Sequence, residues 1–170
     1  KASSSIDRIV NQAIKLNIGI ALHKGLQIAV DIKANVPQQV ITDEMRLVQV
    51  LSNLLNNAVK FTQQGHISIV IENTVSENSN ALIKFTVKDT GIGIPKAKQH
   101  NLFEAFHQAD ESMTRQYGGS GLGLSICKHI INLLDGDIKL TSNENEGTEF
   151  CFVLPFVVDQ THIDRLQLPT

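Results

Sequence analysis

Glycine is concentrated in one part of this chain, and this concentration constrains the fold more than any other feature. Six of the eleven glycines lie between residues 91 and 123. They form two clusters, Gly91 with Gly93 and then residues 118–123, separated by a long polar stretch. Glycine is costly inside helices and strands, so this density indicates a backbone that bends sharply or comes close to a ligand. The pattern is typical of a nucleotide site.

The composition indicates one globular domain, since 42% of the 170 residues are hydrophobic, 19% are charged, and the chain is long enough to bury a core. The formal net charge of −2 gives no attraction for nucleic acid or for an anionic membrane, and we expect neither as a partner. No apolar run approaches the ~20 residues of a membrane span, and no signal peptide is visible. We expect a cytoplasmic domain, in a parent protein that is free or anchored in the inner membrane.

Cys127 and Cys151 interrupt apolar patterns, which predicts reduced core thiols.

Apolar periodicity predicts helices over residues 5–22 and 43–62, and a third that starts at Leu122 and ends at Gly136. Alternating residues predict a half-buried strand over 26–32 and two hairpins, 66–72 with 82–87 and 137–140 with 148–154. Residues 95–117 follow no period, and a connection of that length is typical of a functional lid. We expect an α/β two-layer sandwich, with a mixed, mostly antiparallel sheet covered on one face by about three helices.

Two common glycine-rich nucleotide motifs do not fit this sequence. A Rossmann motif requires an apolar strand running directly into its glycines, and a Walker loop ends in Gly-Lys-Ser or Gly-Lys-Thr. The second glycine cluster instead follows a polar stretch and opens a helix at residues 123–125. Free amides at the start of a helix attract phosphate, although a flexible loop before a helix explains this cluster equally well.

Four motifs in one order resemble the N, G1, F and G2 boxes of sensor histidine kinases. They occupy residues 53–62, 89–94, 103–106 and 119–124. Four independent motifs must coincide, so the resemblance, which covers residues 25–155, is specific. Residues 106–110 and 115–119 are especially similar to the lid of hybrid kinases, which carry a downstream receiver domain. The resemblance implies the Bergerat-type ATP-binding fold of the GHKL superfamily.

The resemblance implies a magnesium and phosphate site on the helix over residues 43–62. Asn57 would supply an oxygen ligand to Mg²⁺, and Lys60 would direct a positive charge toward phosphate. Asn53 would hold the water shell of the metal or form a second contact with it. These residues stand at i, i+4 and i+7, which brings them to one side of the helix, and an amide oxygen suits a hard cation. Without the resemblance, a solvated helix face explains the same three residues.

The resemblance also implies an adenine contact at Asp89, whose carboxylate would accept a hydrogen bond from the exocyclic amine. Thr148 would support this contact, although threonine after glycine is also ordinary at the start of a strand. Gly91 and Gly93 would let the backbone beside Ile94 approach the base.

In the lid, Arg115 would reach the terminal phosphate, unless it is a free surface arginine. Tyr117 would cover the nucleotide or pack against the lid. Phe103 and Phe106 are interpreted as lid anchors in the core or docking points for a partner. The remaining lid positions would wrap the phosphates, and they are Gly119, Ser120, Gly121, Leu122, Gly123 and Leu124.

The implied function is transfer of the ATP γ-phosphoryl group to a histidine on a separate dimerisation domain, with a receiver domain or response regulator downstream. None of the six histidines stands in a phosphoacceptor context. Residues 1–24 would then be a helix leading from the dimerisation domain, 25–157 the catalytic ATP-binding domain, and 158–170 a linker.

Catalysis would rest on positioning and on charge neutralisation by Mg²⁺, Lys60, Arg115 and backbone amides. Asn53 stands where related hydrolases carry a water-activating glutamate, and an amide is a poor base, which favours transfer over hydrolysis. Two alternatives remain: a regulatory module that binds ATP without transferring it, and an interaction domain that binds no ATP.

Overall fold

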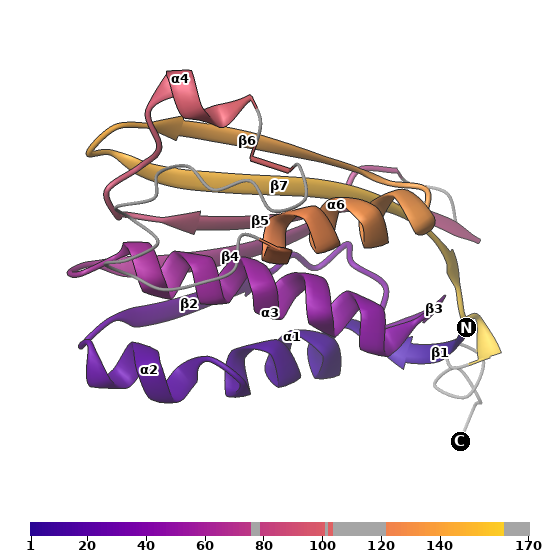
Figure 1. Ribbon diagram of the computed structural model, residues 1–170. Helices are drawn as coiled ribbons and strands as arrows, with labels where there is room; N and C mark the ends of the chain where they lie inside the picture. Colours follow the sequence, from indigo (N-terminus) through magenta and orange to yellow (C-terminus); the bar gives the residue numbers. More distant parts are fainter. Residues whose placement is uncertain (76–78, 101, 104–121, 162–170) are drawn as a thin grey trace.

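A computed structural model describes residues 1–75, 79–100, 102–103 and 122–161 (Figure 1). Within these ranges, seven strands form one sheet. The strands are β1 Ala2–Ser5, β2 Gln27–Ile32, β3 Gln39–Thr42, β4 His66–Asn73, β5 Asn80–Asp89, β6 Asp137–Asn143 and β7 Gly147–Val158. The helices are α1 Ile6–Lys15, α2 Ile18–His23, α3 Glu44–Phe61, α4 Lys96–Gln99 and α6 Leu122–Leu133.

The sheet is mixed and mostly antiparallel, as predicted. Its strand order is β1-β3-β7-β5-β4-β2, and β6 pairs with β7 beside this path. In the part of the chain that the structure describes, β2 and β4 are the only parallel neighbours. The β4–β5 and β6–β7 hairpins confirm the two predicted hairpins, and their strands extend beyond the predicted bounds.

Strand β7 has neighbours along both edges. On one edge it pairs with β5 from Thr148 to Val157. On the other edge, residues 147–153 pair with β6, and residues 157–158 pair with β3, which in turn pairs with β1. A single strand therefore connects the β6–β7 hairpin at one end of the sheet with the corner formed by β1 and β3 at the other (Figure 1).

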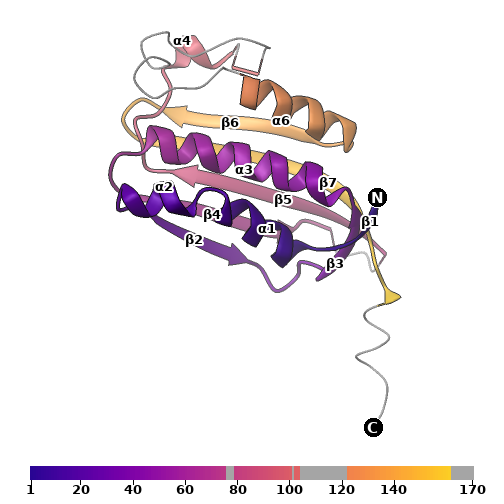
Figure 2. The same cartoon turned by 60° about the horizontal axis from the view of Figure 1, so that its bottom comes forward.

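Helices α1, α2, α3 and α6 cover the same face of the sheet (Figures 1 and 2), which confirms the two-layer sandwich. α3 is the central helix of this layer and contacts both α1 and α6. Asp43 caps its N-terminus, and the Asp43 side chain accepts a hydrogen bond from the Arg46 amide at 3.3 Å. Its apolar stripe is buried against the sheet, where the rings of Phe85 and Phe152 stack with centroids 4.8 Å apart.

The single helix predicted over residues 5–22 is wrong, because the chain forms two helices that separate at Leu16 and Asn17. The Asn17 side chain is 3% exposed. Its Nδ2 donates to the Ala13 carbonyl at 3.0 Å and to the carbonyl and hydroxyl of Ser52 at 3.3 and 3.2 Å. A buried amide must find such partners, and this demand interrupts a helix that the apolar spacing alone would continue.

Two short strands, β1 and β3, were not predicted from the sequence. Each has only four residues. Ser5 is the cap of α1, since its hydroxyl accepts a hydrogen bond from the Arg8 amide at 3.3 Å. β2 is more exposed than the predicted half-buried strand because it is an edge strand. Cys127 lies in the core as predicted, whereas Cys151 is only partly buried.

Candidate nucleotide site

Three segments meet at one end of the sheet: the C-terminal end of α3, the loop that follows β5, and the β6–β7 hairpin (Figure 1). The amide of Ile92, in this loop, donates to the Phe61 carbonyl at the end of α3 over 3.2 Å. The carbonyl of Ile92 accepts from the Asn145 amide in the hairpin at 2.6 Å. Backbone hydrogen bonds therefore fix the loop on both sides, and the motifs at 53–62 and 89–94 lie together as predicted.

Asp89 ends β5 and directs a buried carboxylate into this site. The residue is 5% exposed, and its Oδ1 accepts hydrogen bonds from the amides of Gly91 and Thr148 at 2.9 and 3.2 Å. Burial raises the pKa of Asp89, and the two backbone hydrogen bonds oppose that rise. No cation among the described residues pairs with this carboxylate. Both of these hydrogen bonds go to Oδ1, so within the described ranges Oδ2 is left to accept a hydrogen bond from a ligand.

Thr148 lies opposite Asp89 on β7 and is 7% exposed. Its hydroxyl lies 2.9 Å from the hydroxyl of Ser142, a buried residue of β6. The Ser142 hydroxyl also lies 2.9 Å from the Gly147 carbonyl and accepts a hydrogen bond from the Ile94 amide at 2.8 Å. These contacts join the predicted residues Thr148 and Ile94 through a serine that sequence reasoning missed. A serine in a strand gives no signal in a single sequence, apart from its inward-facing position.

Gly91 and Gly93 are needed for close packing within the protein itself. A Cβ at Gly91 would overlap the Phe61 carbonyl, and a Cβ at Gly93 would overlap the Asn143 carbonyl. Gly93 also has a φ of 69°, which favours glycine. The sequence predicted that these glycines let the backbone approach a base. In the structure, the chain's own backbone fills the space that a Cβ at either glycine would occupy.

Thr62 contributes a buried polar atom without a partner. It is 0% exposed, and its hydroxyl is the one buried side-chain oxygen or nitrogen among the described residues with no hydrogen bond. A Cβ placed on Gly91 would lie 2.9 Å from this oxygen. An orphaned hydroxyl beside the Asp89 loop is what a site for a polar ligand or its water is expected to contain. The residues present therefore fit a nucleotide base.

Asn53, Asn57 and Lys60 lie along one side of α3, all half-buried. Burial raises the pKa of the Cys127 thiol of α6 to about 12, and the Asn53 side chain opposes part of that rise. The described residues hold no cluster of three metal-ligating His, Cys, Asp or Glu side chains. A magnesium ion held mainly by phosphate oxygens needs few protein ligands, so the amides of Asn57 and Asn53 remain its candidate partners.

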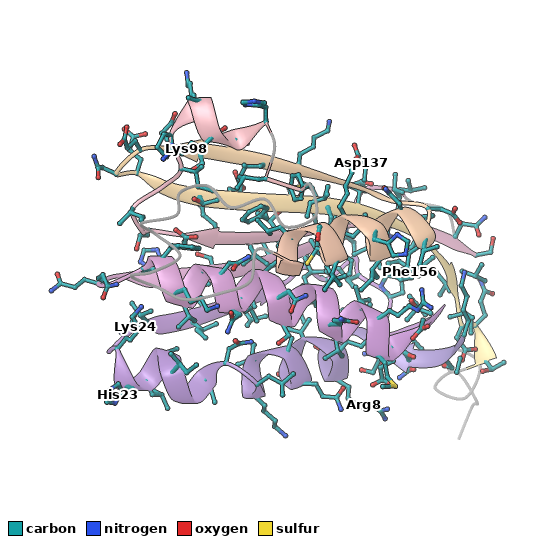
Figure 3. The ribbon with its side chains drawn as sticks, in the orientation of Figure 1. Arg8, His23, Lys24, Lys98, Asp137 and Phe156 are labelled. Carbon is teal, nitrogen blue, oxygen red and sulfur yellow. The ribbon has the colours of Figure 1, made fainter. Side chains whose placement is uncertain are left out.

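Lys24 holds the C-terminal end of α3 from the side of α2 (Figure 3). Its Nζ donates to the carbonyls of Val59 and Lys60 at 2.5 and 3.3 Å. The last carbonyls of a helix lack intrahelical partners and attract positive charge. Together with the Ile92 amide on the Phe61 carbonyl, Lys24 gives three successive carbonyls a partner beside the site.

The predicted lid lies mostly outside the described residues, and so do Arg115, Tyr117, Gly119, Ser120 and Gly121. Leu122 begins α6, and Gly123 and Leu124 are half-buried in its first turn. Phe103 packs against the core, with its ring 6.1 Å from that of Phe150, which confirms its interpretation as an anchor. Phe106 lies outside the described residues.

The family model described as "Histidine kinase-, DNA gyrase B-, and HSP90-like ATPase" matches residues 42–158, which include α3, the Asp89 loop and the β6–β7 hairpin. The chain belongs to this family. Within it, the chain is 46% identical over 129 residues to the signal transduction histidine-protein kinase BarA of Escherichia coli (strain K12), which covers 76% of this chain and 14% of that protein. It is 40% identical over 166 residues to hybrid signal transduction histidine kinase A of Dictyostelium discoideum, covering 92% of this chain and 8% of that protein. The chain thus spans a small part of these relatives.

Solved structures of histidine kinases share the fold. Full-length ShkA in complex with AMPPNP superposes with a TM-score of 0.78 and 31% identity, covering 93% of this chain and 31% of that chain. The nucleotide-free catalytic domain of ThkA superposes with a TM-score of 0.73 and 26% identity, covering 91% of this chain and 96% of that chain. This chain is therefore an ATP-binding catalytic domain of the histidine kinase type, and the predicted resemblance is confirmed.

None of the helices in the described part of the chain combines the length and the apolar character that a membrane span requires.

Proposed function

We propose that this domain binds ATP with Mg²⁺ and transfers the γ-phosphoryl group to a histidine on a dimerisation domain, as part of a hybrid sensor histidine kinase. The observation that carries the proposal is Asp89. A buried carboxylate with no cation beside it, in the described residues, is costly unless a donor completes its hydrogen bonds. The exocyclic amine of adenine is such a donor.

In the proposed complex, Asp89 and Thr148 hold adenine beside the loop that contains Gly91, Gly93 and Ile94. Asn57 would hold Mg²⁺, with Asn53 on its water shell or as a second contact, and the ion would supply positive charge at the phosphates. Lys60 and Arg115 would add charge, and Tyr117 would cover the nucleotide. Gly119, Ser120, Gly121, Leu122, Gly123 and Leu124 would enclose the phosphates with backbone amides.

The proposed transfer breaks the bond between the γ-phosphorus and the oxygen that bridges it to the β-phosphate. A bond forms to an imidazole nitrogen of the acceptor histidine, and ADP leaves. The side chains of this domain position the reactants and neutralise charge, which supplies most of the catalysis in such transfers. No base is required of this domain, which agrees with an amide at Asn53.

The partners of the domain follow from the same proposal. Residues 1–24 would lead from a dimerisation domain with the acceptor histidine, residues 25–157 would form the catalytic domain, and residues 158–170 would lead toward a receiver domain. The relatives support this arrangement because several are named hybrid kinases and are much longer than this chain. We propose a cytoplasmic location for the domain, in a parent protein that is free or anchored in the inner membrane.

Calorimetric titration with ATP, with and without Mg²⁺, tests the proposal. We expect saturable binding that Asp89→Asn abolishes, because an amide presents a donor where adenine needs an acceptor. The matched control is Asp137→Asn, an exposed carboxylate at the far end of β6 (Figure 3), which should bind ATP like the wild type. Absence of ATP binding to the folded wild-type domain would refute the proposal.

A second experiment separates a kinase from a module that only binds nucleotide. The domain is mixed with the dimerisation domain of its parent protein and radiolabelled ATP, and transfer to histidine is measured. We expect labelling that requires Mg²⁺ and is lost in Asn57→Ala. ATP binding without any labelling would favour the regulatory module.

A further inference from the structure

We infer that Ser142 is a positioning residue that fixes the direction of the Thr148 hydroxyl and thereby makes the base site select a nucleotide with an exocyclic amine. The inference rests on the proposed function, in which Asp89 and Thr148 contact the base. Ser142 itself touches no ligand in this proposal and acts through Thr148.

The Ser142 hydroxyl lies at the centre of three contacts, two within the β6–β7 hairpin and one to the loop that follows β5. It accepts from the Ile94 amide at 2.8 Å, and it lies 2.9 Å from both the Gly147 carbonyl and the Thr148 hydroxyl. Ser142 and Thr148 are each 7% exposed, so water does not compete freely for these contacts. The serine oxygen therefore has three close polar partners and only one proton to give.

The chemistry of the partners determines where each proton lies. The Ile94 amide can only donate, and the Gly147 carbonyl can only accept. The Ser142 proton must therefore go to Gly147 if that contact is a hydrogen bond. The contact between the two hydroxyls then requires the proton of Thr148. In this arrangement all three contacts are hydrogen bonds. If Ser142 donated to Thr148 instead, the Ser142 oxygen would face the Gly147 carbonyl oxygen with no proton between them.

The network is also held in place from outside the hairpin. The Nε2 of Gln99, in α4, donates to the carbonyls of Ile94 and Ser142 at 2.7 and 2.9 Å. The Thr148 amide donates to Asp89 Oδ1 at 3.2 Å, which links the serine network to the proposed adenine contact. The hydroxyl of Ser142 thus cannot turn away without losing partners on two segments.

The consequence is that Asp89 and Thr148 together offer only hydrogen-bond acceptors to the base. The Thr148 proton is committed to Ser142, so its oxygen presents lone pairs, and ionised Asp89 presents the free oxygen Oδ2. A base with an amine at this position, as in adenine, satisfies both groups. A base with a carbonyl oxygen there, as in hypoxanthine, places one acceptor against the two acceptors Thr148 and Asp89. No hydrogen bond forms, and buried polar atoms remain unpaired.

Dissociation constants for ATP and for inosine triphosphate, measured by calorimetry with Mg²⁺, test the inference. The wild type should prefer ATP. Ser142→Ala frees the Thr148 proton to turn toward a base carbonyl, and we expect the preference to fall about five- to tenfold, the equivalent of roughly one hydrogen bond. Thr148→Val removes the acceptor without changing the shape of the side chain and should lower the preference by a similar factor. Thr141→Ala, at an exposed neighbour on the opposite face of β6, is the control and should change nothing.

The decisive measurement is the double variant Ser142→Ala with Thr148→Val. If Ser142 acts through Thr148, the double variant should show the same preference as Thr148→Val alone. Ser142→Cys, which keeps the site filled with a weak donor, should act in the same direction and serves if the alanine variant does not fold.

The inference is overturned if the Ser142 variants weaken both nucleotides by the same factor, since that indicates a purely structural role. It is also overturned if Ser142→Ala lowers the preference further when Thr148 is already valine. Failure of the wild type to bind ATP would instead refute the proposed function and this inference with it, so the two failures are distinguishable.

Discussion

Lys24 gives the clearest prediction about how the nucleotide site is supported. Its ammonium group donates to the carbonyls of Val59 and Lys60, and the next carbonyl, of Phe61, receives the Ile92 amide of the Asp89 loop. Lys24→Met keeps the aliphatic chain and removes the charge and both hydrogen bonds. Residue Lys24 lies between α2 and the end of α3 (Figure 3), so the loss is local to this end of the molecule.

The magnitude follows from the contacts. Hydrogen bonds from a charged donor contribute about 1.5–3 kcal/mol, and a cation at a helix C-terminus about 0.3–1 kcal/mol. Partial burial also lowers the pKa of Lys24, which shows that desolvation of the ammonium group offsets part of this gain. We expect Lys24→Met to lower the free energy of unfolding by about 1–2 kcal/mol, which for a domain of this size lowers Tm by about 2–8 °C.

Thermal unfolding and amide hydrogen exchange provide the assay. Lys139→Met, at an exposed lysine on the outer face of β6, is the matched control for the loss of one charge. Exchange at the Ile92 amide should accelerate in the Lys24 variant and not in the control, because the carbonyl that receives it becomes less fixed. Equal Tm values for the two variants, or unchanged exchange at Ile92, would show that Lys24 does not stabilise this end of α3.

Three further predictions concern packing, pH and thiol reactivity. Gly91→Ala forces a methyl group onto the backbone at the end of α3 and should destabilise the domain by about 1–3 kcal/mol in urea denaturation, whereas Gly19→Ala, which meets open space, should not destabilise it. Burial raises the pKa of Asp89 above its ordinary value of 3.8, so the folded state binds the proton more tightly than the unfolded state. The contribution of Asp89 to stability therefore falls as the pH rises through the folded pKa. Asp89→Asn should flatten the pH dependence of the free energy of unfolding and leave the ligand-free domain at least as stable at pH 7. Iodoacetamide at pH 7.5 should label the partly buried Cys151 and spare Cys127, which is buried and has a pKa of about 12. Mass spectrometry of peptides measures the labelling of each cysteine. Equal labelling would contradict the packing of α6 on α3.

The sequence predicted the parts of the fold that have a strong period. The stripe of α3 and the alternation of β4, β5 and β7 reflect burial against one core, so periodicity alone located them. It did not locate the break at Asn17, because that break depends on a hydrogen bond to Ser52 on a helix 35 residues away. It also missed β1 and β3, whose four-residue strands are held by pairing with each other and with β7 rather than by any pattern of their own.

The candidate site shows the same division. Asp89 could be named because it lies in one of the four ordered motifs, and Thr148 because the family resemblance implies a threonine in the last hairpin. Ser142, Thr62 and Lys24 could not be named, although Thr62 lies within the first motif, because each takes its significance from a contact that only the fold creates. These contacts are with the Thr148 hydroxyl, the Gly91 loop and the carbonyls of α3. For Gly91 the structure adds a packing requirement that was not predicted, because a single sequence cannot distinguish room for a ligand from room for the chain's own backbone.

The double pairing of β7 has a consequence for how such a domain can be joined to others. Its twelve residues run from Gly147, in the hairpin of the nucleotide site, to Val158, beside β3 and β1. At about 3.3 Å per residue, the eleven steps of this strand separate the two places by about 36 Å. The chain thus passes into β1 and out of β7 at the same corner, opposite the nucleotide site (Figure 1). A segment joined at that corner can therefore change in length without altering the backbone of the candidate nucleotide site, so the points of attachment and the site can vary independently.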